Sequence, residues 1–237
     1  MTLYETIFKR RQVRKYNNTP LDKQTLDTIL AHTLAIKQME GQKAHFELAS
    51  AEEVSGGVAP HYLLSSCEES AAAYVNVGYI LQKVDLYIQS MGFGSSWFMG
   101  IQPKEQCDNH CITLAFGNTD VPLRNSAVDF KRLPIEKISY VDNAIAQAIR
   151  LAPSAMNSQP WKLEFADGKV IIQDVGRGIM RVMLRNKLNK IDVGIAVRHA
   201  VIALEQEGKT VTQITPKSEG KGFEIRIAYR LGENAHG

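Results

Sequence analysis

Two long apolar segments match each other at a constant offset, and this repeat limits the chain to folds with two similar halves. The first, YVNVGYILQKVDLYIQSMG, spans residues 74–92, and the second, KIDVGIAVRHAVIALEQEG, spans residues 190–208. Each is apolar over most of its circumference and ends at a glycine, so we predict a buried helix for each. At an offset of 116 residues the segments share three positions: Val77 and Val193, Gly78 and Gly194, Gly92 and Gly208.

The segments before each of these helices repeat as well. LDTILAH, residues 26–32, corresponds to DNAIAQA, and AHFELA, residues 44–49, corresponds to WKLEFA at nearly the same offset. Identity is low, but length and order agree. We therefore predict a first half over residues 1–134 and a second half over residues 135–237.

Periodicity and turn signals predict the other elements. A capping box of Thr2 and Glu5 begins a helix that we expect to reach Arg14. An Asp-Gly turn at residues 167–168 predicts a hairpin. We also expect a helix over residues 21–35, strands over 45–51, 62–66, 111–116 and 221–231, and a frayed tail over 232–237. His45 and His61 stand alone, and we interpret both as structural.

Composition indicates a globular protein. Of 237 residues, 44% are hydrophobic and 22% are charged, enough to bury a sizeable core. The formal net charge of +3 is too small to predict a nucleic-acid binder. We expect a cytoplasmic protein without a membrane segment, because no apolar run is long enough to span a bilayer. Cys67, Cys107 and Cys111 are interpreted as reduced thiols, since a second cluster of zinc ligands is missing.

The segment LAPSAMNSQPWKLEF, residues 151–165, joins a helix to a strand. The preceding residues 141–151 have the apolar spacing of a helix, and Pro153 ends it because proline disfavours a helical residue before it. Ser154, Asn157, Ser158 and Gln159 then provide donors and acceptors that suit a planar, polar-edged ligand. On the residues alone, an ordinary turn with a buried Trp161 remains an equal alternative.

Positive charge gathers at the end of the first predicted helix. FKRRQVRKY, residues 8–16, holds five basic side chains: Lys9, Arg10, Arg11, Arg14 and Lys15. Such a run repels itself unless the side chains extend into water or an anion lies nearby. A solvated surface and an anion site are therefore both compatible with it.

Four motifs together resemble the nitroreductase superfamily of FMN-dependent oxidoreductases. APSAMNSQPWKLEF resembles its APSxxNxQPWxF signature, and GFGSSWFMG, residues 92–100, resembles its GLGSxWxxG turn. RRQVRKY resembles its RRSxRxF motif, with Gln12 in place of the serine. DFKRLP resembles its KxRLP segment, with Phe130 in the place of the lysine. The resemblance implies an α+β fold with antiparallel-rich central sheets flanked by helices.

The same resemblance implies a set of FMN-binding residues. Arg10, Arg11 and Arg132 would neutralise the phosphate, and Arg14 would lie near N1 and O2 of the flavin ring, where a cation favours the reduced form. Backbone amides near Met99 would face flavin N5. The full expected set is Arg10, Arg11, Gln12, Arg14, Trp97, Met99, Gly100, Arg132, Pro153, Ser154, Ala155 and Asn157. On this assignment, Arg10→Ala should lose flavin while the fold stays intact.

The motifs are divided between the halves. RRQVRKY, GFGSSW and KRLP lie in the first half and APSAMNSQPW lies in the second, while the complementary motifs are missing. This resembles a divergent branch of the superfamily in which an internal duplication forms an intramolecular pseudo-dimer. We therefore expect one flavin site built from both halves, in a chain that can act as a monomer.

The implied activity is that of an FMN-dependent NAD(P)H oxidoreductase. NADH or NADPH would reduce the flavin, and a small electrophile such as a nitroaromatic or a quinone would reoxidise it. We expect no metal, no partner nucleic acid and no dinucleotide-binding GxGxxG fingerprint. Two alternatives stay open: a protein that stores or senses FMN without turnover, and an anion or nucleic-acid binding module built on RRQVRKY.

Overall fold

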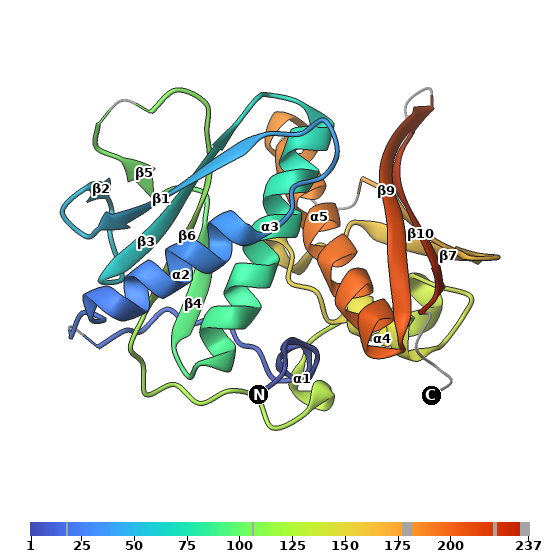
Figure 1. Ribbon diagram of the computed structural model, residues 1–237, viewed down its shortest axis with the longest axis horizontal. Coiled ribbons are helices and arrows are strands. Elements are labelled where there is room, and N and C mark those ends of the chain that lie inside the picture. The colour runs from blue at the N-terminus through green and yellow to red at the C-terminus, as the bar shows by residue number, and fades with distance from the viewer. Residues whose placement is uncertain (18, 106, 177–181, 220–221, 233–237) are drawn as a thin grey trace.

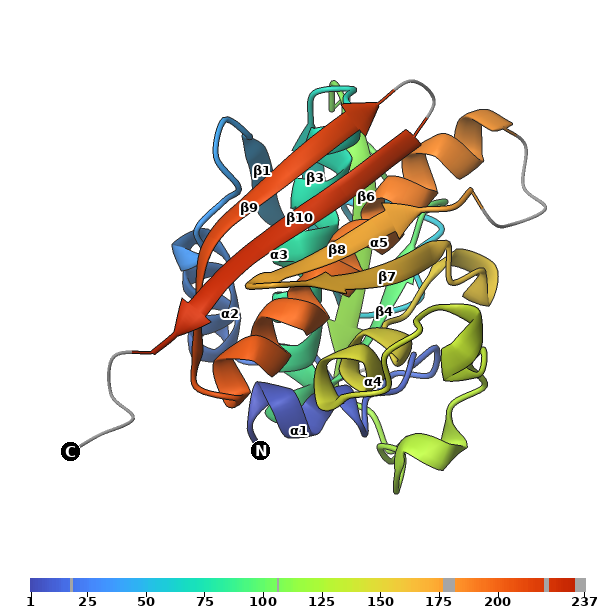
Figure 2. The same ribbon diagram turned by 90° about the vertical axis from the view of Figure 1, so that its right-hand side faces the viewer.

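Two antiparallel sheets enclose two long helices. The computed structural model describes residues 1–17, 19–105, 107–176, 182–219 and 222–232. Helices α3 (Ala71–Ser90) and α5 (Val182–Gln206) lie side by side in the centre, with one four-stranded sheet on either side (Figure 1). Figure 2 shows the second sheet in front and both helices behind it. The expected α+β fold with antiparallel sheets and flanking helices is confirmed.

The first half supplies the first sheet. Helices α1 (Leu3–Ile7) and α2 (Lys23–Ala35) come first along the chain. The strands are hydrogen-bonded in the order β1 (Ala44–Ser50), β3 (His61–Cys67), β6 (His110–Gly117) and β4 (Gly94–Phe98), with every pair antiparallel. A separate two-stranded antiparallel sheet consists of β2 (Val54–Ser55) and β5 (Gln102–Pro103).

The second half repeats this plan. After α4 (Ala144–Arg150), the strands are ordered β7 (Trp161–Ala166), β8 (Lys169–Asp174), β10 (Gly222–Leu231) and β9 (Lys209–Glu219). Each half therefore runs helix, two strands, long helix, two strands, and each sheet places its fourth strand between the second and the third. The two halves thus share one order of elements and one order of strands, while the internal duplication and the boundary at residues 134 and 135 stay predictions.

Two glycines set the distance between the central helices. A Cβ atom on Gly78 would lie 2.1 Å from the carbonyl oxygen of Ile191, and one on Gly194 would lie 2.0 Å from that of Val75. Both pairs are related by the same offset of 116 residues. The contact is thus reciprocal, as across the two-fold axis of a symmetric dimer. Any larger side chain at either glycine would force α3 and α5 apart.

Side-chain caps fix where the helices begin. Thr2 and Glu5 form the predicted capping box of α1. Asp22, Ser70 and Asn143 each accept a hydrogen bond from a backbone N–H in the first turn of α2, α3 and α4. Gly92 and Gly208 follow α3 and α5 with positive φ angles of 92° and 71°, as the sequence predicted.

The first helix is shorter than expected. It ends at Ile7, and the following residues 10–14, here called the N-terminal arm, are not helical. Gln12 instead forms a parallel bridge with Ser95, and the N–H of Val13 donates to the carbonyl of Ser95 at 3.0 Å. The prediction of a helix to Arg14 was wrong, because the backbone of the arm pairs with the edge of β4 and extends the first sheet.

Two more differences concern strands. The glycine-rich segment predicted as a turn forms β4 from Gly94 onward, where Ser95 and Ser96 are fully buried. Strand β9 was not predicted at all. Most of the tail expected to fray, residues 233–237, lies outside the described residues. Within the part of the chain that the structure describes, no helix is both long and apolar enough to cross a membrane.

Candidate functional site

A pocket of about 160 Å³ lies where the two halves meet. The first half contributes the N-terminal arm and the end of β4, and the second half contributes α5 and the segment 151–160, here called the proline turn. Its walls contain eight of the twelve expected cofactor-binding residues: Arg10, Gln12, Arg14, Trp97, Met99, Pro153, Ser154 and Ala155. Two segments more than 130 residues apart in the sequence thus line one cavity.

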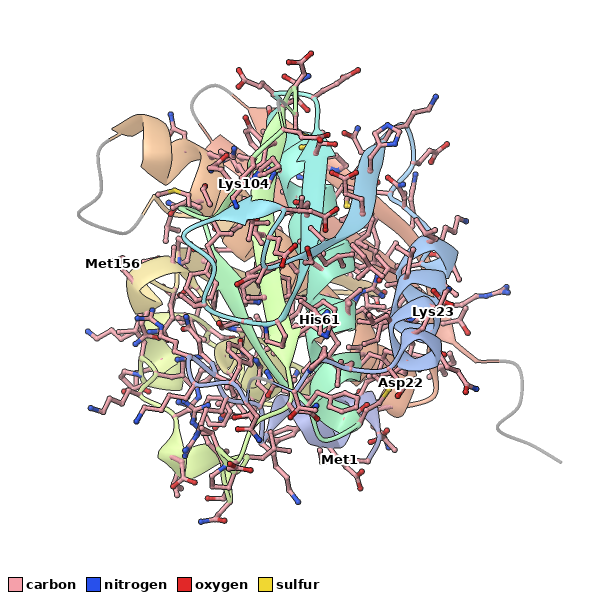
Figure 3. The ribbon with its side chains drawn as sticks, turned by 90° about the vertical axis from the view of Figure 1, so that its left-hand side faces the viewer. Met1, Asp22, Lys23, His61, Lys104 and Met156 are labelled. Atoms are coloured by element: carbon pink, nitrogen blue, oxygen red, sulfur yellow. The ribbon has the colours of Figure 1, made fainter. Side chains whose placement is uncertain are left out.

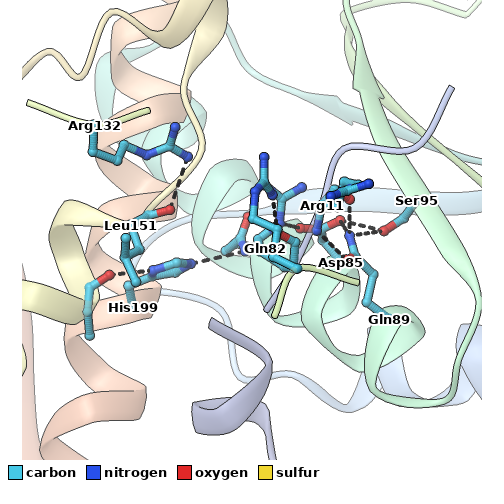
Figure 4. A network of polar contacts seen from close by, with 11 residues as sticks. Arg11, Gln82, Asp85, Gln89, Ser95, Arg132, Leu151 and His199 are labelled. Carbon is cyan, nitrogen blue, oxygen red and sulfur yellow. Dashed lines mark hydrogen bonds and ion pairs between the residues drawn. The ribbon is translucent and has the colours of Figure 1, made fainter. Parts of the chain in front are cut away.

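Arg10 forms the most buried part of the pocket wall contributed by the arm. This residue is 2% exposed, and its Nε donates to Oδ2 of Asp85 on α3 at 2.9 Å. Asp85 Oδ1 also accepts from Ser95 Oγ at 2.5 Å and from Gln89 Nε2 at 3.1 Å (Figure 4). Arg10 Nη2 is buried and has no hydrogen-bond partner. An unpaired guanidinium nitrogen beside a cavity favours a bound acceptor or anion.

Arg11 and Arg14, which the sequence grouped with Arg10, differ from it in position. Gln89 holds the backbone of Arg11 by accepting from its N–H at 2.8 Å and donating to its carbonyl at 2.9 Å. The side chain of Arg11 does not line the pocket. Arg14 does line it and is exposed. Residues alternate in direction along an extended arm, so Arg10 and Arg14 share a side that Arg11 does not.

Arg132 and Asn157 are also outside the pocket walls. Arg132 donates from Nη1 to Oδ1 of Asn157 at 2.7 Å. Its Nη2 donates to the carbonyl of Leu151 at 3.1 Å (Figure 4). Asn157 in turn donates to the carbonyl of Lys131 at 2.8 Å. These two residues therefore join the segment before the second half to the proline turn. Gly100, next to the pocket-lining Met99, has open space around it.

An arginine that sequence reasoning missed joins this positive region. Arg124 donates from Nη1 to the carbonyl of Arg10 and lies 4.3 Å from the ring centre of Phe130. Burial, together with the positive charges of Arg10, Arg124 and Arg150, lowers the pKa of Arg132 to about 9. Several arginines thus lie close together with few acidic residues among them, and this arrangement favours a bound anion. Arg124 lies outside every motif, so no pattern in the sequence indicated it.

Internal hydrogen bonds hold the proline turn in shape. Ser154 Oγ accepts from the N–H of Gln159 at 2.9 Å, and the buried Gln159 accepts from the N–H of Leu133 at 2.8 Å. Met156 has a φ of 53° and is 75% exposed at the surface (Figure 3). Trp161 is fully buried at the start of β7. The hydrogen bonds of Gln159 thus brace the turn, while Pro153 to Ala155 face the pocket.

Asp192 is a pocket residue that the sequence did not single out. It lies on α5, is 3% exposed, and accepts the N–H of Ala155 at 3.0 Å and 3.1 Å with its two carboxyl oxygens. Burial raises the pKa of Asp192 well above its ordinary value, the Ala155 amide partly offsets this, and Asp174 adds to the rise. The sequence signal that could have indicated this residue is an acidic side chain within an otherwise apolar helix.

A second pocket of about 230 Å³ lies at the corresponding place in the other half of the fold. Lys37 to Glu40 take the place of Pro153 to Met156, and the N–H of Met39 donates to Asn76 Oδ1 at 2.9 Å. Met39 and Asn76 precede Ala155 and Asp192 by 116 residues each. Among its described lining residues this pocket has no arginine.

Comparison with known proteins agrees with this fold. The family described as "Putative TM nitroreductase" matches residues 2–204 of the chain. The chain therefore belongs to this nitroreductase family. A comparison with curated proteins gave no match.

One solved structure shows the same fold, and two others resemble part of the chain. The crystal structure of a "putative nitroreductase" from Thermotoga maritima MSB8 is similar with a TM-score of 0.71 at 22% identity, covering 96% of this chain and 94% of that one. An FMN-dependent nitroreductase from Clostridium difficile R20291 has a TM-score of 0.45 at 17% identity, covering 60% of this chain and 99% of its own. A nitroreductase family protein from Clostridium difficile 630 has a TM-score of 0.49 at 16% identity, covering 60% and 100%.

Proposed function

We propose that this nitroreductase-family chain is an FMN-dependent NAD(P)H oxidoreductase with one flavin site per chain. The observation that carries the proposal is the pocket between the halves, where the unpaired Nη2 of Arg10 and the Pro153–Ala155 segment line the same cavity. The buried Trp97 Nε1 in its wall also lacks a partner. These donors suit the oxygen and nitrogen acceptors of a flavin, so the residues present fit this group.

The residues of the chain would have distinct tasks. Arg10 and Arg14 would offer positive charge to FMN, with Arg14 on the exposed side and Arg10 held rigid by Asp85. Pro153, Ser154 and Ala155 would cover the opposite face of the ring. Bound FMN would supply the acceptor of two electrons and a proton from NADH or NADPH, which it would pass to a small electrophile.

The phosphate assignments of Arg11 and Arg132 receive no support from their positions, because neither side chain lines the pocket. Arg124 donates to the backbone carbonyl of Arg10 but does not line the pocket either. We propose that Arg10 and Arg14, whose side chains line the pocket, provide the charge that the phosphate needs. Arg11, Arg124 and Arg132 would add to the positive potential around it.

The repeated topology supports the pseudo-dimer. A reciprocal glycine contact between α3 and α5 is what an isologous dimer interface would leave after two copies joined into one chain. The second pocket, whose described lining residues lack arginine, would be the counterpart that no longer binds FMN. We propose that a single chain is the functional unit.

The test is an absorbance spectrum of the purified protein, followed by anaerobic titration with NADH and with NADPH. A flavin spectrum that is bleached by either nicotinamide supports the enzyme. A flavin spectrum that neither nicotinamide changes would favour an FMN storage or sensing protein. Protein that fails to bind added FMN would refute both.

A further inference from the structure

Asp192 combines three features that the tasks above do not use. It is buried, it lines the pocket between the halves, and it contacts the proline turn through the N–H of Ala155. Among the described residues, no lysine or arginine forms an ion pair with it. A carboxylate buried without a cation is costly, so such a group tends to hold a proton.

The other half of the fold shows that the hydrogen bond from Ala155 to Asp192 does not by itself need an ionisable side chain. There the N–H of Met39 donates to the amide oxygen of Asn76 at 2.9 Å, close to the 3.0 Å between Ala155 and Asp192. A neutral amide therefore holds the corresponding segment in place. The ionisable carboxyl of Asp192 is an additional property, and it occurs on the side where the pocket contains arginines.

The charged groups around Asp192 come from β8, α5 and the N-terminal arm. Asp174 on β8 is the nearby acid, and it pairs with Lys190 on α5 itself. Arg10 and Arg14 of the N-terminal arm share the pocket with Asp192. The proline turn contributes Ala155 and Ser158, which carry no charge. Because Asp85 balances Arg10, a neutral Asp192 leaves Arg14 as the uncompensated charge of the pocket.

We propose that Asp192 is a positioning residue whose neutral, protonated form anchors the Pro153–Ala155 segment and keeps the pocket positive, and whose ionisation weakens the binding of an anionic ligand. The proposal rests on the FMN site proposed above for the identity of the ligand. Ionisation is the loss of one proton to solvent, and it cancels the charge of Arg14 within the cavity. By linkage, an anionic ligand in turn makes Asp192 hold its proton more firmly.

The experiment compares the wild type with Asp192→Asn, which keeps the acceptor for Ala155 and removes the proton. Asn76→Asp is the matched control, because it places a carboxyl at the equivalent position beside the other pocket. Asp192→Ser is a second replacement that cannot ionise. Each protein is freed of flavin, and urea unfolding and FMN affinity are measured between pH 5 and pH 9.

The two readouts have separate expectations. The folded-state pKa of Asp192 is raised, so wild-type stability should fall as the pH rises toward that pKa, and Asp192→Asn should not show this fall. FMN affinity of the wild type should drop about tenfold more than that of Asp192→Asn over the same range, equivalent to one unit of pKa coupling. Asn76→Asp should lose stability with rising pH but keep the wild-type profile of FMN affinity.

The outcomes separate the two proposals. Parallel profiles for wild type, Asp192→Asn and Asp192→Ser in both readouts would overturn the role of Asp192, even if FMN binds well. Unfolding profiles that diverge in a protein that never binds FMN would support the proton on Asp192 and overturn the flavin site. Divergence in both readouts supports the proposal in full.

Discussion

Replacing Arg10 by alanine removes a cation that serves the core as well as the pocket. The sequence led us to expect loss of flavin with an intact fold, but Arg10 is buried and paired with Asp85 at 2.9 Å. Removing one partner of a buried ion pair costs about 3–5 kcal/mol, because the remaining charge stays buried. Asp85 keeps its hydrogen bonds from Ser95 and Gln89, so we expect the lower end, about 3 kcal/mol.

This cost should appear in flavin-free protein. For a chain of this length, about 3 kcal/mol lowers the melting temperature by roughly 6–12 °C. Urea unfolding followed by tryptophan fluorescence measures the free energy directly. The double variant Arg10→Ala with Asp85→Asn removes both charges and should recover most of the loss, giving a coupling energy of about 2 kcal/mol or more.

Arg14→Ala is the matched comparison. Arg14 lines the same pocket but is exposed, so its loss should weaken FMN binding and change the unfolding free energy by no more than about 0.5 kcal/mol. If Arg10→Ala instead unfolds within about 1 kcal/mol of the wild type, the buried ion pair does not stabilise the fold and the reasoning fails.

Three further predictions concern the helices and the second pocket. Gly78→Ala and Gly194→Ala should each destabilise the folded protein by about 2 kcal/mol, because the clash between the central helices outweighs the gain in helix propensity. Gly100→Ala is the control, since there is open space around Gly100 and no loss is expected. Equal urea midpoints for the three variants would contradict this. Burial lowers the pKa of His199 to about 3, so the unfolded chain binds a proton there that the folded protein does not. The free energy of unfolding should therefore fall by up to about 1.4 kcal/mol per pH unit below pH 6.5. Unfolding curves measured in acid should show a smaller slope for His199→Gln. Equilibrium titration should give one FMN per chain; two would show that the second pocket also binds it.

Much of the fold could be predicted from the sequence because the same pattern of helices and strands occurs twice along the chain. The offset between Gly78 and Gly194 predicted two similar halves, and the structure places these residues in reciprocal contact. Strand β9 escaped notice because it lies on an edge of the sheet and none of its described side chains is buried, so apolar alternation is weak. The segment from Gly94 to Phe98 was predicted as a turn from its glycines, yet pairing with β6 makes it a strand.

The site was predictable in its parts but less so in its geometry. The motifs identified eight residues that meet in one pocket, including Arg10 and Ala155. A motif does not say which way each side chain points along an extended arm, so Arg11 was grouped with neighbours whose direction it does not share. Asp192 contacts Ala155, and Arg124 contacts Arg10. Because these partners are distant along the chain, the local sequence does not predict either contact.

The contact between Gly78 and Gly194 also bears on how such a molecule can change. When two identical subunits meet across an axis, every substitution arises in both at once, and a residue useful in one place must be tolerable in its mirror position. Here the facing positions are encoded separately. Asparagine at position 76 and aspartate at position 192 show the result: the two sides of one symmetric framework are free to acquire different chemistry without disturbing the helix contact that holds them together.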